Sequence, residues 1–126
     1  MPHLILECSR MIGNKIDFNS LFKKLHELLS EQLPTKISSC KSRKVIYEQV
    51  YIGDDFLMNE FMHLTVKILP GRTDDKKQQI GQEILTILSG SMKPYNPEKI
   101  QLSVEILDLS PSYFKQLSGG APVALR

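Results

Sequence analysis

The sequence predicts an α/β (α+β) fold: a tandem β-α-β repeat that forms a four-stranded mixed sheet with two helices on one face. The order strand, helix, strand occurs twice along the 126 residues. The two halves also match at a nearly constant spacing, because His3-Leu4 and His63-Leu64 lie 60 residues apart and the apolar stripes of the two helices lie 59 apart. We therefore expect a single domain over residues 1–126, with half-repeats at about 1–55 and 60–110 and a C-terminal tail at 111–126.

The first half begins with a short apolar run at residues 3–8, which predicts a strand, and continues into a polar loop at 9–14. Asp17 is placed to cap a helix, and Pro34 ends that helix because the residue before a proline avoids helical dihedral angles. Residues 44–52, rich in Val, Ile and Tyr, predict a second strand, and 53–55 predict a turn. Spacings of three and four residues give the helix one apolar face: Phe18, Leu21, Phe22, Leu25, Leu28 and Leu29.

The second half repeats this pattern. Residues 61–68 alternate between apolar and polar side chains, which predicts a strand, and 69–72 predict a turn. Thr73 is placed to cap a second helix, which Gly90 is expected to close. A fourth strand is expected from about residue 99 to 107. The apolar stripe of this second helix comprises Ile80, Ile84, Ile87 and Leu88.

Composition excludes several classes of protein. Sixteen Lys and Arg against fourteen Asp and Glu leave a net charge of +2, too small for a dedicated nucleic-acid-binding domain. No stretch approaches the roughly 20 apolar residues that a transmembrane helix needs, and the first residues do not resemble a secretory signal. We therefore expect a cytoplasmic protein with no membrane partner.

The cysteines and histidines form no recognisable site. Cys8 and Cys40 are too far apart in the sequence for a C-x-x-C motif, and the three histidines are scattered. Two thiols in a cytoplasmic chain of this size are usually reduced and buried. We expect no metal site.

One face of the predicted sheet has nothing in the chain to cover it. The helices of two adjacent β-α-β units lie on the same face, and residues 110–126 are too few to bury the other. We therefore expect oligomers in which sheets pack around a shared axis.

Two residues could support chemistry, one in each half. Removal of Met1 would leave Pro2 as a free secondary amine, and an α-amino group with a pKa near 8, lowered by nearby cations, is suited to act as a general base. Arg72 lies just before the second helix, where its guanidinium and the first backbone N–H groups can both attract a carboxylate. At the offset of 60, Pro2 corresponds to Met62 in the second half, and Arg72 corresponds to Ile12 in the first. Each half therefore has a functional group that the other lacks.

Several blocks of the sequence resemble the 5-carboxymethyl-2-hydroxymuconate isomerase family of the tautomerase superfamily. Residues 62–79 also resemble the start of a 4-oxalocrotonate tautomerase subunit, with Met62 in place of its N-terminal proline. The blocks span nearly the whole chain in the family's order: residues 1–9 (Met-Pro-His-Leu-Ile-Leu-Glu-Cys-Ser), 63–68 (His-Leu-Thr-Val-Lys-Ile) with Gly71-Arg72, Gln78-Gln79, and 102–106 (Leu-Ser-Val-Glu-Ile) with 114–116 (Phe-Lys-Gln).

The resemblance implies a homotrimeric, cofactor-independent isomerase of homoprotocatechuate (4-hydroxyphenylacetate) catabolism. It implies that Pro2 moves a proton between positions of an unsaturated 2-hydroxy or 2-oxo acid, and that Arg72 binds a substrate carboxylate or polarises its carbonyl. The family's Arg-Ser-Arg segment before the second strand reads Lys41-Ser42-Arg43 here, so Lys41 and Arg43 are further substrate-binding candidates. Lysine lacks the planar fork of arginine, so Lys41 is expected to orient a carboxylate less tightly than the family's arginine.

Two alternatives remain at this point. The first is another tautomerase activity of the same superfamily, such as phenylpyruvate tautomerisation. The second is a non-catalytic trimeric homologue, or a binding module on a similar sheet. RNA binding is disfavoured by the small net charge and by the absence of a basic-aromatic RNP-like motif.

Overall fold

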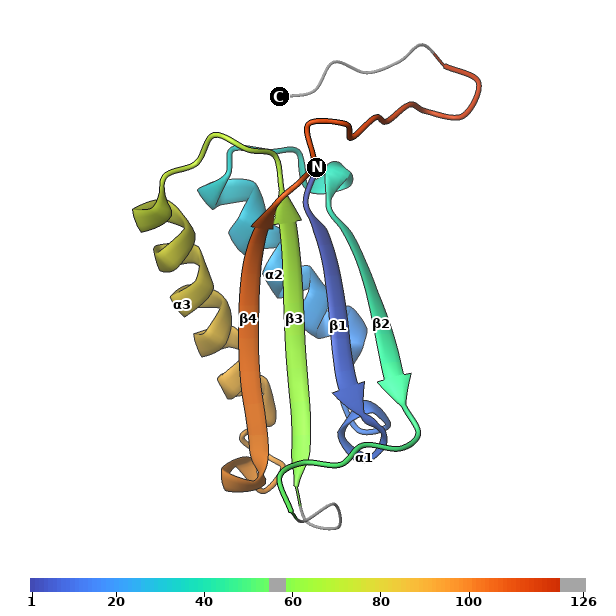
Figure 1. Ribbon diagram of the computed structural model, residues 1–126, viewed down its shortest axis with the longest axis vertical. Coiled ribbons are helices and arrows are strands. Elements are labelled where there is room, and N and C mark those ends of the chain that lie inside the picture. Colours follow the sequence, from blue (N-terminus) through green and yellow to red (C-terminus); the bar gives the residue numbers. More distant parts are fainter. Residues whose placement is uncertain (55–58, 121–126) are drawn as a thin grey trace.

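The computed structural model describes residues 1–54 and 59–120, which form a four-stranded sheet with helices on one face (Figure 1). The sheet has the order β2-β1-β3-β4. Strand β1 pairs with β2 in parallel, β3 pairs with β4 in parallel, and the two central strands β1 and β3 are antiparallel. The predicted mixed sheet of two β-α-β units is confirmed. The elements are β1 (His3–Ser9), α1 (Arg10–Gly13), α2 (Phe18–Gln32), β2 (Lys41–Tyr47), β3 (Glu60–Ile68), α3 (Asp74–Met92) and β4 (Ile100–Asp108), with short 3-10 turns at Ile37–Ser39 and Pro97–Lys99.

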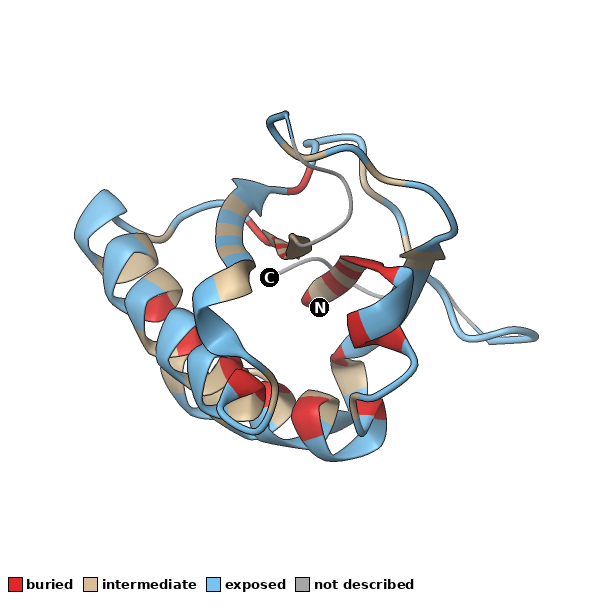
Figure 2. Ribbon diagram, turned by 90° about the horizontal axis from the view of Figure 1, so that it is seen from below, coloured by how far each residue is buried: buried red, intermediate tan, exposed pale blue. Residues whose placement is uncertain are grey.

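The core lies between the sheet and helices α2 and α3. Alternate residues of the central strands point toward the helices and are fully buried, among them Leu4, Leu6, Leu64 and Val66. Seen along the strands, the buried residues of both helices line the side that faces the sheet (Figure 2). Burial of these apolar side chains is the main force that holds the two half-repeats together. The helical residues of this core are Phe18, Leu21, Leu25 and Leu29 from α2 and Ile80, Ile84, Leu88 and Met92 from α3.

Both long helices begin at the predicted caps. The Asp17 side chain accepts a hydrogen bond from the backbone N–H of Ser20, and the Thr73 side chain accepts one from that of Lys76. Each cap satisfies an N–H group that has no partner inside the helix. The cap at Thr73 fixes the start of α3 two residues after Arg72.

Three local expectations differ from the structure. Residues 10–13 form the short helix α1 instead of a loop, and β2 runs from Lys41 to Tyr47 instead of 44–52. Helix α3 also continues past Gly90, because Met92 extends the buried stripe by one more turn and is 1% exposed. Residue 55 of the expected turn and residues 121–126 of the expected tail lie outside the described residues.

The second face of the sheet is open. Figure 1 looks directly onto this face, and the helices lie behind it. Its side chains mix apolar and charged groups, including Val45, Tyr47 and Leu107, which are each about 40% exposed. Among the helices described, none is long and apolar enough to cross a membrane.

Candidate active site

A pocket of about 290 Å³ lies at the end of the sheet where β1 begins and β3 ends. We call it the N-terminal pocket. Its walls come from four segments: the first two residues, the connection between α2 and β2, the connection between β3 and α3, and the C-terminal tail. Its polar lining residues are Thr35, Lys36, Ser39, Arg72 and Lys115, together with the α-amino group of Met1. Among the described residues, 1–54 and 59–120, no acidic side chain lines this pocket.

Pro2 is buried at the base of the N-terminal pocket, next to the first residue of β1. Its carbonyl oxygen accepts a hydrogen bond from the backbone N–H of Lys41 at 3.0 Å, which continues the β1–β2 pairing by one residue. Met1 occupies the space in front of it, where its α-amino group donates to Thr35 Oγ1 at 3.1 Å and its sulfur contacts Lys115 Nζ. Removal of Met1 would therefore both expose the Pro2 nitrogen and enlarge the pocket.

The environment of this chain end favours a neutral amine. Burial lowers the pKa of the Met1 α-amino group to about 6, and the positive charges of Lys115, Lys41 and Arg72 contribute in the same direction. The negative charge that Cys40 would carry as a thiolate opposes them. An amine with this pKa is mostly unprotonated at pH 7, which is the state that a general base requires.

Arg72 approaches the pocket from the turn between β3 and α3, and its guanidinium also holds two structural elements together. Nη2 donates to the carbonyl oxygen of Leu33 at 2.8 Å, and Nη1 donates to that of Leu69 at 3.2 Å. Leu33 is the C-terminal cap residue of α2, so the positive charge also lies at the negative end of that helix. A guanidinium has five N–H donors, so several remain for a ligand.

The structure adds two cations that the sequence analysis did not assign to a site. Lys36 comes from the connection between α2 and β2, and Lys115 comes from the tail after β4. No periodicity or motif spacing identifies them, because both lie in irregular segments. The Phe-Lys-Gln block at 114–116 was the one available signal for Lys115. With Arg72, they give the pocket three positively charged side chains.

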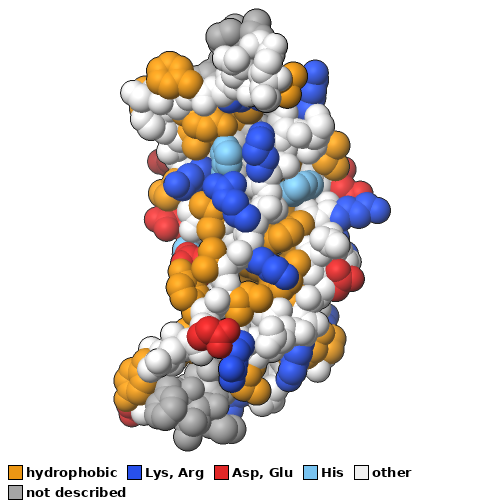
Figure 3. Space-filling model, turned by 90° about the vertical axis from the view of Figure 1, so that its right-hand side faces the viewer, with side chains coloured by type: hydrophobic (Ala, Val, Ile, Leu, Met, Phe, Trp, Pro, Cys, Tyr) orange, Lys and Arg blue, Asp and Glu red, His pale blue; other side chains and the backbone are white. Residues whose placement is uncertain are grey.

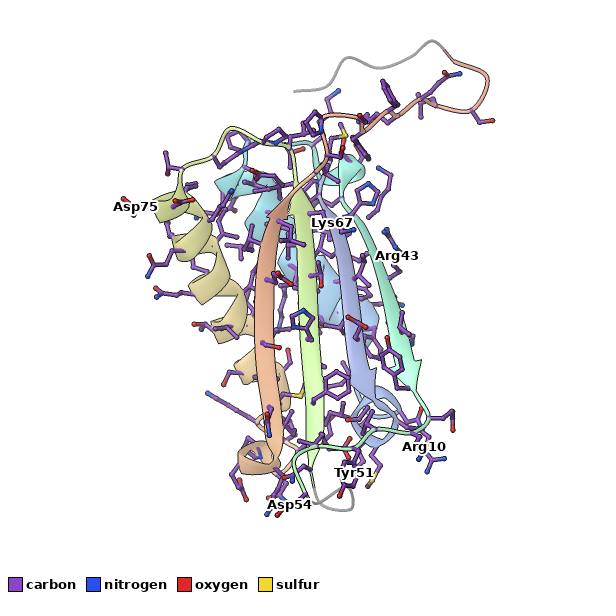
Figure 4. The ribbon with its side chains drawn as sticks, viewed as in Figure 1. Arg10, Arg43, Tyr51, Asp54, Lys67 and Asp75 are labelled. Carbon is purple, nitrogen blue, oxygen red and sulfur yellow. The ribbon has the colours of Figure 1, made fainter. Side chains whose placement is uncertain are left out.

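Lys41 and Arg43 lie beside the N-terminal pocket and do not line it. Lys41 Nζ donates to the carbonyl oxygen of Ser39, a pocket residue, at 3.2 Å. Arg43 Nη1 lies 3.1 Å from His3 Nδ1, on the open face of the sheet. In Figure 4 Arg43 and Lys67 flank β1 in the upper half of the sheet, and Figure 3, which faces the β2 edge, shows Lys, Arg and His side chains gathered there. The substrate-binding roles predicted for Lys41 and Arg43 remain predictions.

The repeat-equivalent end of the sheet has a different chemistry. A second pocket of about 380 Å³ lies there, lined by Ile12 and Glu60 among others. Glu60 Oε1 accepts hydrogen bonds from Ser9 Oγ at 2.7 Å and from the Ile12 backbone N–H at 3.0 Å. Ile12 is the repeat counterpart of Arg72, and its backbone N–H binds a carboxylate of the chain itself. The asymmetry explains why the two halves cannot both form the same anion-binding pocket.

The two cysteines are free and buried, as expected. Burial raises the pKa of the Cys8 thiol to about 11 and also raises that of Cys40. Both are therefore thiols at neutral pH and poor nucleophiles. Within residues 1–54 and 59–120, no group of three or more His, Cys, Asp or Glu side chains could hold a metal ion.

Comparison with known families identifies the chain. The model of the 5-carboxymethyl-2-hydroxymuconate isomerase family matches residues 2–118. The chain belongs to this family. It is 29% identical over 118 residues to the 5-carboxymethyl-2-hydroxymuconate Delta-isomerase of Escherichia coli, and the match covers 92% of this chain and 94% of that protein. The family resemblance and the isomerase class predicted from the sequence are confirmed.

Solved structures confirm the fold predicted for this member of the isomerase family. A 5-carboxymethyl-2-hydroxymuconate isomerase from Deinococcus radiodurans R1 superposes with a TM-score of 0.81 at 22% identity, over 91% of this chain and 88% of the other. A fused 4-OT described as a symmetric trimer gives a TM-score of 0.69 at 14% identity, over 95% and 94%. This chain thus shares its fold with both an isomerase of the same name as its family and the fused 4-OT.

Proposed function

We propose that this isomerase converts 5-carboxymethyl-2-hydroxymuconate into its 2-oxo isomer, with the nitrogen of Pro2 as the base that moves the proton. The observation that carries the proposal is the position of Pro2, which is buried at the base of a pocket with three cationic side chains in its lining. The membership of the family and the E. coli relative's activity support the same reaction.

The chemistry of the substrate matches that of the pocket. A muconate has a carboxylate at each end of a six-carbon diene, and the carboxymethyl branch at C5 adds a third. A pocket lined by Lys36, Arg72 and Lys115, with no acidic side chain among its described lining residues, is suited to a trianion. This complementarity favours the tricarboxylate over phenylpyruvate, which has one carboxylate and an uncharged ring.

The proposed reaction needs one base and one region of positive charge. The neutral nitrogen of Pro2 takes the proton from the 2-hydroxyl group and becomes a cation, while the substrate becomes a dienolate. Positive charge from Arg72 stabilises the oxygen on which negative charge develops. The Pro2 cation then returns the proton to C5, which leaves a 2-oxo-3-ene and regenerates the neutral amine. No atom is gained or lost overall.

We also propose that the protein is a homotrimer and that its open sheet face is buried between copies. The partly exposed Val45, Tyr47 and Leu107 on that face support this, as does the symmetric trimer formed by the fused 4-OT of the same fold. In such a trimer Arg43 belongs to the interface, and any contact between Arg43 and substrate would form only in the assembled protein. A cytoplasmic location remains a prediction.

The test compares protein that begins at Pro2 with protein that retains one residue before it. Intact mass identifies each form, and ultraviolet absorbance follows loss of the dienol. We expect kcat/KM to be about 10²- to 10⁴-fold lower in the retained form, because an amide nitrogen cannot accept a proton. Equal activity of the two forms would exclude Pro2 as the base. A higher kcat/KM for phenylpyruvate than for the tricarboxylate would instead assign the other tautomerase activity.

A further inference from the structure

The C-terminal tail returns to the end of the sheet at which the chain begins. In Figure 1 it leaves β4 and crosses over the top of the sheet beside the N-terminus. Most of its side chains point to solvent, and Phe114 and Leu117 are 84% and 76% exposed. Tyr113 and Lys115 are the exceptions within residues 110–120, because both are partly buried. Their alternation with exposed neighbours indicates that this part of the tail has one side directed at the protein.

Tyr113 attaches the tail to the sheet. Its hydroxyl lies 2.8 Å from His3 Nε2, and the two rings meet edge to face with their centroids 5.6 Å apart. Arg43 can only donate hydrogen bonds, so its contact with His3 Nδ1 requires that nitrogen to be the acceptor. His3 Nε2 therefore carries the hydrogen and donates to the Tyr113 hydroxyl. This pair fixes the tail two residues before Lys115.

Lys115 reaches the position next to the proposed base. Its Nζ contacts the sulfur of Met1, the residue that must leave before Pro2 has a free nitrogen. Within residues 1–54 and 59–120 this is the one hydrogen-bonding contact of the Lys115 ammonium. Arg72, by contrast, is partly occupied by Leu33 and Leu69 on another wall. Among residues 1–54 and 59–120, loss of Met1 would therefore leave the Lys115 ammonium beside Pro2 without a hydrogen-bonding partner.

We propose that Lys115 is a specificity-determining residue that binds a carboxylate attached to C5 of the substrate, and that Tyr113 positions it. The inference rests on the proposed function. C5 must lie against the Pro2 nitrogen to receive the proton, so the carboxylates it carries lie on the same side of the pocket as Lys115. Arg72 remains for the carboxylate and oxygen at the other end. The tail thus selects acids with a charged group at the carbon that is protonated.

The test uses two dienols that undergo the same proton transfer. 5-Carboxymethyl-2-hydroxymuconate has carboxylates on C5, whereas 2-hydroxy-2,4-pentadienoate has none. Both are assayed above pH 8, where the amine is neutral, so that loss of a nearby cation does not change its protonation.

We expect Lys115→Met to lower kcat/KM for the tricarboxylate about 10- to 100-fold and that for the pentadienoate less than about twofold. Lys115→Arg should restore most of the loss, and Lys24→Met, which removes an exposed lysine of α2, should have no effect.

The positioning role of Tyr113 has its own readout. Tyr113→Phe keeps the ring contact with His3 and removes the hydroxyl. We expect a higher KM for the tricarboxylate, an unchanged kcat and no effect on the pentadienoate. Equal loss on both substrates in the Lys115→Met variant, or no loss on either, would overturn the role of Lys115 while leaving the proposed function intact. A wild-type protein inactive on both dienols would overturn the proposed function and the role of Lys115 with it.

Discussion

Replacement of Arg72 by alanine should damage both stability and substrate binding, and the structure allows the two effects to be separated. The guanidinium donates to two backbone carbonyl oxygens at 2.8 and 3.2 Å. Hydrogen bonds of a charged group contribute about 1.5–3 kcal/mol each, and water can replace part of this because Arg72 is only half-buried. We expect Arg72→Ala to lower the free energy of unfolding by about 1–3 kcal/mol and kcat/KM by about 10²-fold or more.

Urea denaturation at one fixed protein concentration measures the first effect, and steady-state kinetics on folded protein measures the second. Arg72→Lys is the matched variant, because it keeps the charge and cannot span both carbonyl oxygens. It should lose most of the same stability but less of the activity. An unchanged urea midpoint in Arg72→Ala would refute the argument that these two hydrogen bonds stabilise the fold. An unchanged kcat/KM would refute the assignment of Arg72 to the substrate.

Two further predictions concern the amine and the second pocket. For protein that begins at Pro2, kcat/KM should rise with pH to a plateau, with a midpoint below the ordinary value of about 8 for an α-amino group, because the positive charges of Lys115, Lys41 and Arg72, which lower the pKa of the Met1 amine, would also lie near the Pro2 nitrogen. A midpoint at or above 8 in the pH–rate profile would contradict this. Glu60→Ala should lower the free energy of unfolding by about 1–3 kcal/mol with kcat/KM unchanged, because it leaves the Ile12 N–H without its acceptor and the buried Ser9 hydroxyl with only the more distant Phe61 carbonyl oxygen at 3.4 Å. Glu60→Gln keeps an oxygen acceptor and should restore most of that stability, and a fall in kcat/KM in either variant would show that the two pockets are coupled.

Sequence predicts the ends of a strand well when its side chains alternate between the buried core and an exposed face. Strand β3 alternates between the core and the open face, so its pattern identifies it almost to the residue. Strand β2 lies at the edge of the sheet, and most of its side chains are exposed, so its apolar residues are a poor guide to its ends. The ends of β2 are set instead by the seven residues of β1, with which β2 pairs from Lys41 to Tyr47. Helix α3 passes Gly90 for a similar reason, since tertiary packing of Met92 overrides a local stop signal.

The residues of the candidate site also differ in how far the sequence could indicate them. Pro2 could be found because removal of Met1 would make it the terminal amine, and Arg72 because it lies just before a predicted helix. Lys36 and Lys115 could not, because only the folded chain brings their segments to the same pocket. Only the family resemblance points to Lys41 and Arg43 as substrate-binding residues. The pairing of Lys41 with His3 and of Arg43 with Ile5 directs both toward the open face, a placement that depends on a register the sequence does not specify.

For the proposed role of Pro2 as the base, the attachment of this residue to the central strand has a consequence for the entropy of substrate binding. A base on a flexible side chain must give up rotamers when the substrate arrives, and each immobilised side chain costs about 0.5–1.5 kcal/mol. The nitrogen of Pro2 belongs to a ring and to the main chain, and its residue is tied to β2 by the hydrogen bond between its carbonyl and Lys41. Its position is therefore fixed before binding by the same pairing that holds the sheet together. Orientation of this nitrogen should persist on heating until the sheet itself unfolds.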